Sequence, residues 1–219
     1  MRQQRLAHGW PVCCTLPRHD IPYPFAIPTA QRATTMQLPQ RELHDRLRTE
    51  ALANHQRVAT VVRALDPERL VRRPTPPGWS VGEVLQHLCV ADELYRKPLL
   101  ALVNGTRPDA GAPAREWKPT FAGNFIARAL TNPRKVKAPR RMRPGPTPQP
   151  GVVEDFHARD RRMIDLMYQA ASHDWRALRL WSPAVPLPIL RLNLGDVFRI
   201  HVVHVRRHLA QMERVVQSL

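Results

Sequence analysis

Acidic residues, cysteines and long apolar runs are all scarce in this sequence of 219 residues. The three cysteines, Cys13, Cys14 and Cys89, provide no framework of paired bridges. This argues against a disulfide-stabilised secreted protein and favours a reducing, cytoplasmic setting. No window approaches the run of about 18 apolar residues that a membrane span requires, so we expect no membrane segment. Only 18 residues are acidic, against 34 Lys and Arg, which gives a formal net charge of +16.

An excess of positive charge this large raises the question of a nucleic-acid partner. The basic residues, however, are mainly Arg and are spread over the whole chain. The most basic segment, residues 134–150, is broken by prolines and has no aromatic side chains that could stack on bases. We therefore expect no nucleic-acid partner.

Residues 1–35 differ in composition from the rest of the chain. They contain scattered prolines, a single acidic residue and no sustained periodicity. They also lack the apolar segment of a signal peptide. We expect a disordered, dispensable N-terminal extension over 1–35, with Met36 as an alternative start, and one domain over 36–219.

Apolar residues recur at helical spacing in four segments of that domain. The spacing predicts helices over about 40–65, from 80 onward, 153–171 and 193–217. Ser80 and Glu83 have the form of a capping box at the start of the second helix. Pro98 is expected to kink or fray the far end of that helix. No segment has a convincing strand pattern, so the expected fold class is all-α, an up-down four-helix bundle.

The connection between the second and third helices, residues 104–151, is much longer than a minimal bundle needs. It is rich in proline and has no acidic residue between Lys118 and Val153. Within it, the segment FAGNFIARAL at 121–130 could form a short extra helix. Loops of this length are uncommon unless they act as a lid, cross the bundle or are disordered. We expect a long, solvated crossover loop, with a specific anion site as the alternative.

The last helix carries the motif that bears most directly on function, HVVHVRRHLAQ at 201–211. Alternating steps of four and three residues place its three histidines and Gln211 on one stripe, beside an apolar stripe. Buried polar groups need partners, so this stripe requires an explanation. The remaining side is charged and is expected to face solvent: Arg199, Arg206, Arg207, Glu213 and Arg214.

A bound metal ion is one explanation. His204 and His208 stand one helical turn apart and can point at the same ion, whereas His201 lies about 10 Å along the axis from His208. His87, on the inward side of the second helix, could supply a third ligand. His55 and His201 also face inward, so spacing alone leaves the ligand set open, and hydrogen bonding in the core without a metal is the alternative. Candidates for hydrogen-bond partners of the ligands, each with a purely structural role as the alternative, are Glu83, Gln211 and Asp160.

Taken together, these residues resemble the DinB-like superfamily. Its pattern is a Gly-Trp-Ser sequence before the second helix, a His-Leu pair within it, and a late His-x-x-x-His followed by Gln. The resemblance covers residues 36–219 and implies a four-helix bundle whose three histidines bind a divalent metal, often zinc or nickel. It places His201 where the family is usually apolar, so we leave His201 out of the ligand set. The matching residues are Gly78, Trp79, Ser80, His87, Leu88, His204, His208 and Gln211.

The resemblance also implies a class of function. Characterised relatives include transferases and isomerases that use small thiols such as mycothiol or bacillithiol. We therefore expect a transferase in which the metal keeps a low-molecular-weight thiol as thiolate for attack on a small-molecule electrophile. The alternatives are a metal-dependent hydrolase using metal-bound water, and a non-enzymatic binding module with an anionic partner on the basic loop. The oligomeric state stays open, with a homodimer as one alternative.

Overall fold

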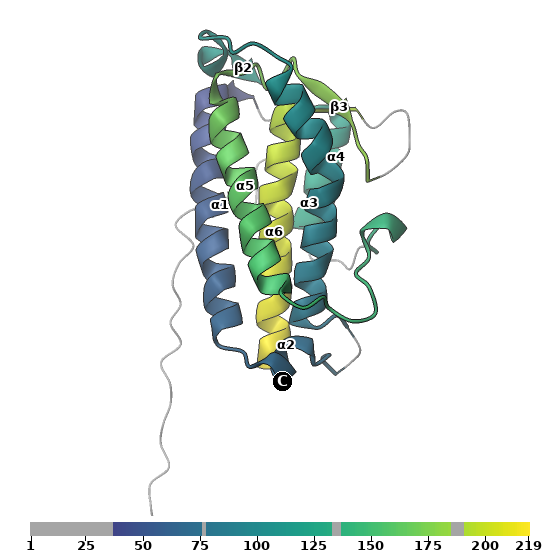
Figure 1. The fold of residues 1–219 in the computed structure, drawn as a ribbon. Helices are drawn as coiled ribbons and strands as arrows, with labels where there is room; N and C mark the ends of the chain where they lie inside the picture. The colour runs from purple at the N-terminus through teal and green to yellow at the C-terminus, as the bar shows by residue number, and fades with distance from the viewer. Residues whose placement is uncertain (1–36, 76–77, 133–136, 185–190) are drawn as a thin grey trace, which may run out of the picture. The chain divides into compact units, whose positions relative to one another are not determined.

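The computed structural model describes residues 37–75, 78–132, 137–184 and 191–219, and these are predominantly helical. Four long helices pack side by side (Figure 1): α1 (Gln40–Arg63), α3 (Val81–Asn104), α5 (Val152–Gln169) and α6 (Leu194–Gln217). Both α5 and α6 contact α1 and α3, which closes the bundle. The predicted all-α fold class is confirmed. The expected extension over 1–35 lies outside the described residues, so its dispensability stays a prediction.

Helices α1 and α6 run in one direction, and α3 and α5 run in the other. The start of α1 meets the end of α5, because the Gln40 side-chain amide donates to the carbonyl oxygens of Ala171 and His173 at 3.1 and 2.8 Å. The ends of α3 and α5 also meet, where the backbone N–H of Asp109 donates to the carbonyl of Ser172. Since α3 and α5 are parallel, the strict alternation of an up-down bundle does not hold for this pair. The predicted long connection returns the chain to the end of the bundle at which α3 began.

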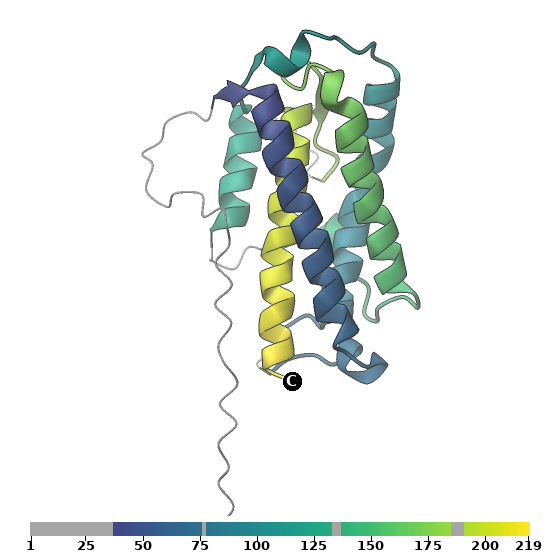
Figure 2. The same cartoon turned by 90° about the vertical axis from the view of Figure 1, so that its left-hand side faces the viewer.

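The extra helix predicted within the long connection is present as α4 (Phe121–Thr131). It packs alongside α6 (Figure 2). Two arginines that we expected to face solvent instead bond to this region. Arg199 donates to the side-chain oxygen of Asn124, and Arg207 donates to the carbonyl of Leu130 at 3.0 Å. That part of the prediction was wrong, because the pattern of one helix does not reveal which distant segment will cover it.

Two small antiparallel strand pairs were not predicted. β1 (Leu38–Pro39) pairs with β2 (Glu116–Trp117), and β3 (Arg179–Trp181) pairs with β4 (Arg191–Asn193). Strands of two or three residues are too short to leave a readable alternation in the sequence. Both pairs lie at the end of the bundle where α1 and α6 begin, and they join the connections to those helices.

The helix ends differ from the prediction in two places. A short helix, α2 (Pro67–Val71), follows α1. Helix α3 continues through Pro98 to Asn104, so of the two expected effects of the proline, fraying is absent, and a kink stays a prediction. The residues beyond it hold the last turns in place, because Leu99 and Val103 are buried in the core. None of the helices within the described stretches is long and apolar enough to cross a bilayer.

The core consists of two large apolar clusters with polar residues at their boundary. One cluster contains Trp117, Trp175 and Phe198, and the other contains Leu85 and Met212. All four long helices carry residues of both clusters. Polar side chains lie along the helices where one cluster ends and the other begins. They are Asn54 and His55 on α1, Asp92 on α3, Asp160 on α5, and His201 and His204 on α6.

A single carboxylate, that of Asp196, joins the starts of α4 and α6. Its Oδ2 accepts from the backbone N–H of Asn193 at 3.1 Å and from the N–H and hydroxyl of Thr120 at 3.1 and 2.7 Å. The two helices can approach this closely because α4 has a glycine at the contact. A Cβ built on Gly123 would lie 2.1 Å from Cγ of Asp196.

We predict that Gly123→Ala destabilises the protein by about 1–3 kcal/mol, because the added methyl group has no space and α4 must shift. Gly145→Ala is the matched control, since its Cβ would meet nothing closer than the Gln86 amide nitrogen at 3.6 Å. The control should change stability by less than about 0.5 kcal/mol. Urea unfolding of both variants measures the difference. An unchanged Gly123→Ala would show that α4 moves away from α6 at little cost.

Candidate metal centre

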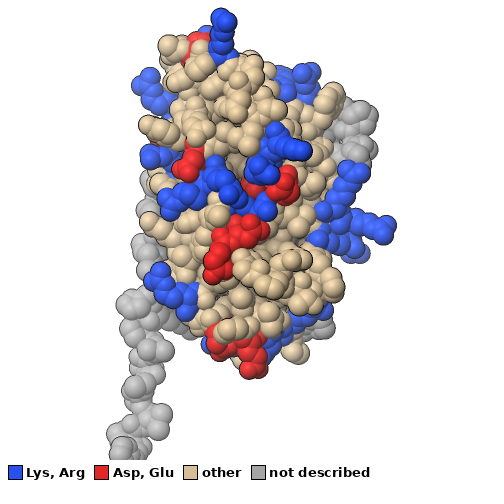
Figure 3. Space-filling model, viewed as in Figure 1, with Lys and Arg blue, Asp and Glu red and all other residues tan. Residues whose placement is uncertain are grey.

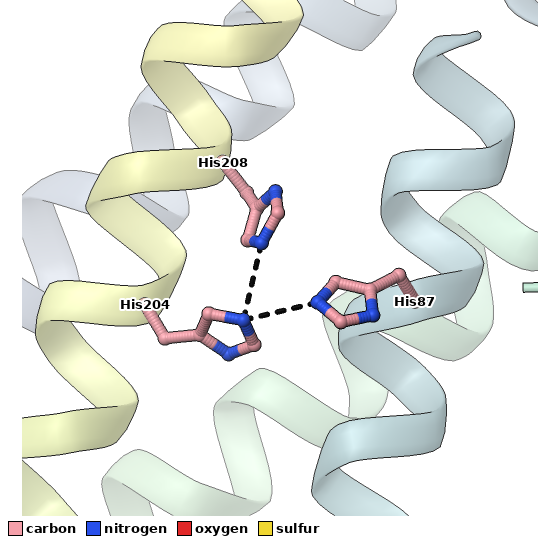
Figure 4. A group of neighbouring side chains, drawn as sticks. All are labelled: His87, His204 and His208. Atoms are coloured by element: carbon pink, nitrogen blue, oxygen red, sulfur yellow. Dashed lines mark hydrogen bonds between the residues drawn. The ribbon is translucent and has the colours of Figure 1, made fainter. Parts of the chain in front are cut away.

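Three histidine rings converge inside the bundle, His87 from α3 and His204 and His208 from α6 (Figure 4). The Nε2 atom of His204 lies 3.0 Å from Nε2 of His87 and 3.1 Å from Nε2 of His208. One ring nitrogen from each residue lies within 4.8 Å of the other two. The structure thus brings together the three residues that the sequence suggested as ligands, although 117 positions separate His87 from His204.

The start of α3 determines where His87 stands. Ser80 and Glu83 form the predicted capping box, with the Ser80 hydroxyl accepting at 3.2 Å and the Glu83 carboxylate accepting at 2.9 Å. Arg73 also donates to Glu83, at 2.9 and 2.5 Å. Burial alone would raise the pKa of Glu83, but the hydrogen bonds from Arg73 and Ser80 outweigh it and lower the pKa. Glu83 therefore anchors the helix start and does not orient the histidine rings.

The outer nitrogens of two rings are held by oxygen acceptors. Nδ1 of His87 donates to the carbonyl of Met142 at 2.5 Å, and Nδ1 of His208 donates to Oε1 of Gln211 at 2.9 Å. A neutral imidazole that carries its proton on Nδ1 leaves Nε2 with a free lone pair. Both lone pairs therefore face the shared centre. Gln211 stands where the sequence suggested, whereas the contribution of Met142 was missed because a backbone carbonyl has no side-chain signature.

Burial keeps these imidazoles uncharged at neutral pH. Desolvation, reinforced by the neighbouring His87, lowers the pKa of His208 to about 3. Desolvation also lowers the pKa of His87, against the opposing effect of its bond to Met142. The pKa of His204 falls well below its ordinary value, through burial first and then through His208 and His87. Only unprotonated imidazole binds a metal ion, so the cluster is ready to do so without first losing protons.

Trp79, from the Gly-Trp-Ser sequence before α3, lies against two of the rings. Its ring centroid is 5.1 Å from that of His87 and 6.5 Å from that of His208, with the planes of Trp79 and His208 only 22° apart. The half-buried Trp79 ring therefore packs against His87 in a tilted arrangement and lies nearly parallel to His208.

Asp160 belongs to a separate network. Its Oδ2 accepts from Nδ1 of His55 at 2.8 Å, and its Oδ1 accepts from Nε2 of His201 at 3.0 Å. Burial would raise the pKa of Asp160, but the two histidine hydrogen bonds lower it to about 2, so the carboxylate is ionised. The structure therefore places His55, His201 and Asp160 in one hydrogen-bonded group, apart from the three converging rings.

Comparison with known proteins identifies the family of this chain. A model of the DinB superfamily matches residues 50–212. The chain belongs to the DinB superfamily. The matched range includes all three converging histidines of this DinB protein, together with Gln211. No match is found among curated proteins or among solved structures.

We predict that Ala at His87, His204 or His208 abolishes stoichiometric zinc binding, because each change leaves only two of the three nitrogens. His201→Ala should retain the metal, since Nε2 of His201 bonds to Asp160 and not to the cluster. Elemental analysis of purified protein measures the metal content. Thermal stability should stop rising with zinc concentration only in the first three variants. An empty site in His201→Ala with a filled site in His204→Ala would contradict this assignment.

We also predict that the metal-free protein loses stability as the pH falls below about 6.5. The pKa of His208 is about 3 in the folded state and near 6.5 in the unfolded chain, so over this window the unfolded chain binds more protons at His208. From this residue alone, stability should decrease by up to about 2 kcal/mol between pH 6.5 and pH 5. Urea unfolding in a chelator at several pH values measures the change. His208→Gln should make the profile shallower without flattening it, because the pKa values of His87 and His204 are lowered as well. A wild-type profile that is flat over this range would contradict the buried, neutral state of the ring.

Proposed function

We propose that the protein is a metal-dependent enzyme in which His87, His204 and His208 hold a divalent ion, zinc or nickel. The observation that carries this proposal is the convergence of three uncharged imidazoles through Nε2. Three protein ligands are typical of catalytic zinc sites, which keep one position open, whereas structural sites are closed by four.

The donor set fits such an ion in chemistry and in size. Tetrahedral zinc–nitrogen bonds of about 2.0–2.1 Å separate the ligand nitrogens by roughly 3.3–3.4 Å. The separations of 3.0 and 3.1 Å from His204 to its two neighbours are close to that value. Metal-binding histidines almost always donate their other ring nitrogen to an oxygen. His87 and His208 do so, to Met142 and Gln211.

We further propose that the reaction is the transfer of a low-molecular-weight thiol to a small electrophile. A divalent ion in this site would supply the Lewis acidity that keeps a thiol ionised at neutral pH. The three ligands carry no charge, so they leave the ion's charge uncompensated and favour an anionic partner. Met142 and Gln211 hold the rings of His87 and His208 in orientation, and Trp79 packs against the ring of His87. A small thiol stays reduced in the cytoplasm, so the proposal includes a cytoplasmic location.

The basic loop supports the proposal that the electrophile carries negative charge. Met142, whose carbonyl bonds to His87, is buried, and its neighbours Arg141 and Arg143 are exposed. Figure 3 shows basic and acidic side chains interspersed over most of the visible face. A group of basic side chains projects at the right-hand edge, where η2 (Arg140–Met142) lies in Figure 1. The segment that contacts His87 through the Met142 carbonyl thus carries exposed positive charge, which would attract an anionic substrate.

Hydrolysis is the second candidate. A metal ion that is held by three neutral imidazoles and keeps one position open can also activate water. The same histidine cluster therefore supports a hydrolase as well. The two candidates differ in whether a thiol has to bind.

Cobalt substitution should separate the two functions. Addition of a small thiol such as 2-mercaptoethanol to the Co²⁺-loaded protein should produce a thiolate-to-cobalt absorption band in the near ultraviolet. The band should appear in wild type and in His201→Ala, and it should be missing in His204→Ala. Cleavage of an activated ester by the loaded wild type without thiol, and without such a band, would favour the hydrolase. Failure of the wild type to bind cobalt would contradict both.

A further inference from the structure

A second pair of histidines stands between α1 and α5. His55 on α1 and His157 on α5 line a pocket of about 420 Å³ that is open to solvent. Their ring centroids lie 4.9 Å apart, with the ring planes at 73°. Neither ring belongs to the converging cluster of His87, His204 and His208.

The centroid separation and interplanar angle of these two rings resemble those of the ring pairs in the metal centre. There the three pairs of centroids are 4.7–5.0 Å apart and the ring planes cross at 64–86°. Two imidazoles bound to one ion through bonds of about 2.1 Å place their ring centres roughly 5 Å apart. The separation of His55 and His157 therefore suits a shared ion.

The buried Asp160 carboxylate holds His55 in the orientation that a metal ligand needs. Nδ1 of His55 donates to Oδ2 of Asp160 at 2.8 Å, so Nε2 is the ring nitrogen left available to an ion. A carboxylate that accepts from the outer nitrogen of a histidine fixes its tautomer and makes the ring a stronger ligand. Burial, and then the neighbouring His55, lower the pKa of His157, which favours the uncharged form of the His157 ring at neutral pH.

Charges of both signs surround the pair. Asp160 and Glu154 act on His157 as negative charges, and Arg161 acts on it as a positive one. Arg63 lines the pocket and would oppose a cation. Its side chain is exposed, however, so solvent and salt screen that repulsion, whereas the Asp160 carboxylate is buried and is screened much less.

We propose that His55 and His157 form a second, outer site for a divalent transition-metal ion, with Asp160 as the positioning residue of His55. Imidazole suits zinc, copper and nickel, and water completes the coordination. With two protein ligands in place of three, this site binds more weakly than the buried cluster does. The inference rests on the contacts of α1 and α5 and is independent of the reaction proposed above.

Calorimetric titration of the full-length, metal-free protein with Zn²⁺ tests this proposal. We expect two classes of site, one tight and one weaker. His157→Gln should weaken the second class about tenfold or more while the first stays unchanged. His204→Ala should remove the first class and keep the second. His44→Gln is the matched control, because His44 is also on α1 and also bonds a carboxylate through Nδ1, that of Asp45 at 2.9 Å, but its ring partner is Trp175.

Two further variants keep the test decisive. His55→Gln should reproduce the effect of His157→Gln, with circular dichroism confirming the helical fold of each. Arg63→Ala should preserve or tighten the second class, because it removes a positive charge from the pocket. A single class of site in the wild type, or a second class that survives both His55→Gln and His157→Gln, would overturn the outer site. Loss of the second class in Arg63→Ala would do the same, since removing a positive charge from the pocket cannot weaken a cation site formed by His55 and His157. Absence of the tight class alone would contradict the proposed function and leave the outer site standing.

Discussion

Three imidazole nitrogens that share one centre inside an apolar bundle are the constraint on which the arrangement of this protein depends. Charged rings at such separations would repel one another strongly where the dielectric constant is low, so burial favours the uncharged form. The geometry also requires α3 and α6 to keep an exact rotation and height relative to each other. Both helices accordingly begin at complete capping boxes, Ser80 with Glu83 and Asn193 with Asp196. Each box prevents the first turn from fraying and so keeps the ligand-bearing turn in register.

The parallel direction of α3 and α5 explains why the connection between them is long. The chain has to travel back along the bundle, and on the way it lays α4 against α6 and brings Met142 to His87. Asp196 links this connection to α6, the helix that carries His204 and His208. Its carboxylate caps α6 and accepts a hydrogen bond from Thr120 at the start of α4. The long connection, which a minimal bundle does not need, thus supplies the Met142 carbonyl that sets the tautomer of His87. It also supplies the partners of two arginines on the far side of α6.

Local periodicity was sufficient to predict the four long helices, because each buries one face over several turns. The spacing of His204 and His208 was likewise visible, since one turn separates them. What the sequence could not show were pairings between distant segments. No local pattern predicts that α3 and α5 run parallel. None predicts that α4 covers Arg199 and Arg207, or that the carbonyl of Met142 accepts a hydrogen bond from His87. Inward-facing Asp160 was recognisable as unusual, but its two partners, on α1 and α6, are set only by packing.

The polar residues at the boundary between the two apolar clusters also explain why the histidines on one stripe of α6 divide into two groups. Asp160 is a buried, ionised carboxylate, and such a group requires donors on both oxygens. If the ring of His201 turned towards the converging cluster, Oδ1 of Asp160 would lose its donor, which costs about 1–3 kcal/mol for a buried group, and more for a charged one. His204 and His208 have no such carboxylate to leave, and their Nε2 atoms meet each other at 3.1 Å. The position of one acid on α5 therefore assigns the histidines of α6 to different roles. A stripe that is uniform in sequence becomes a neutral, metal-ready cluster next to a charged hydrogen-bonded group.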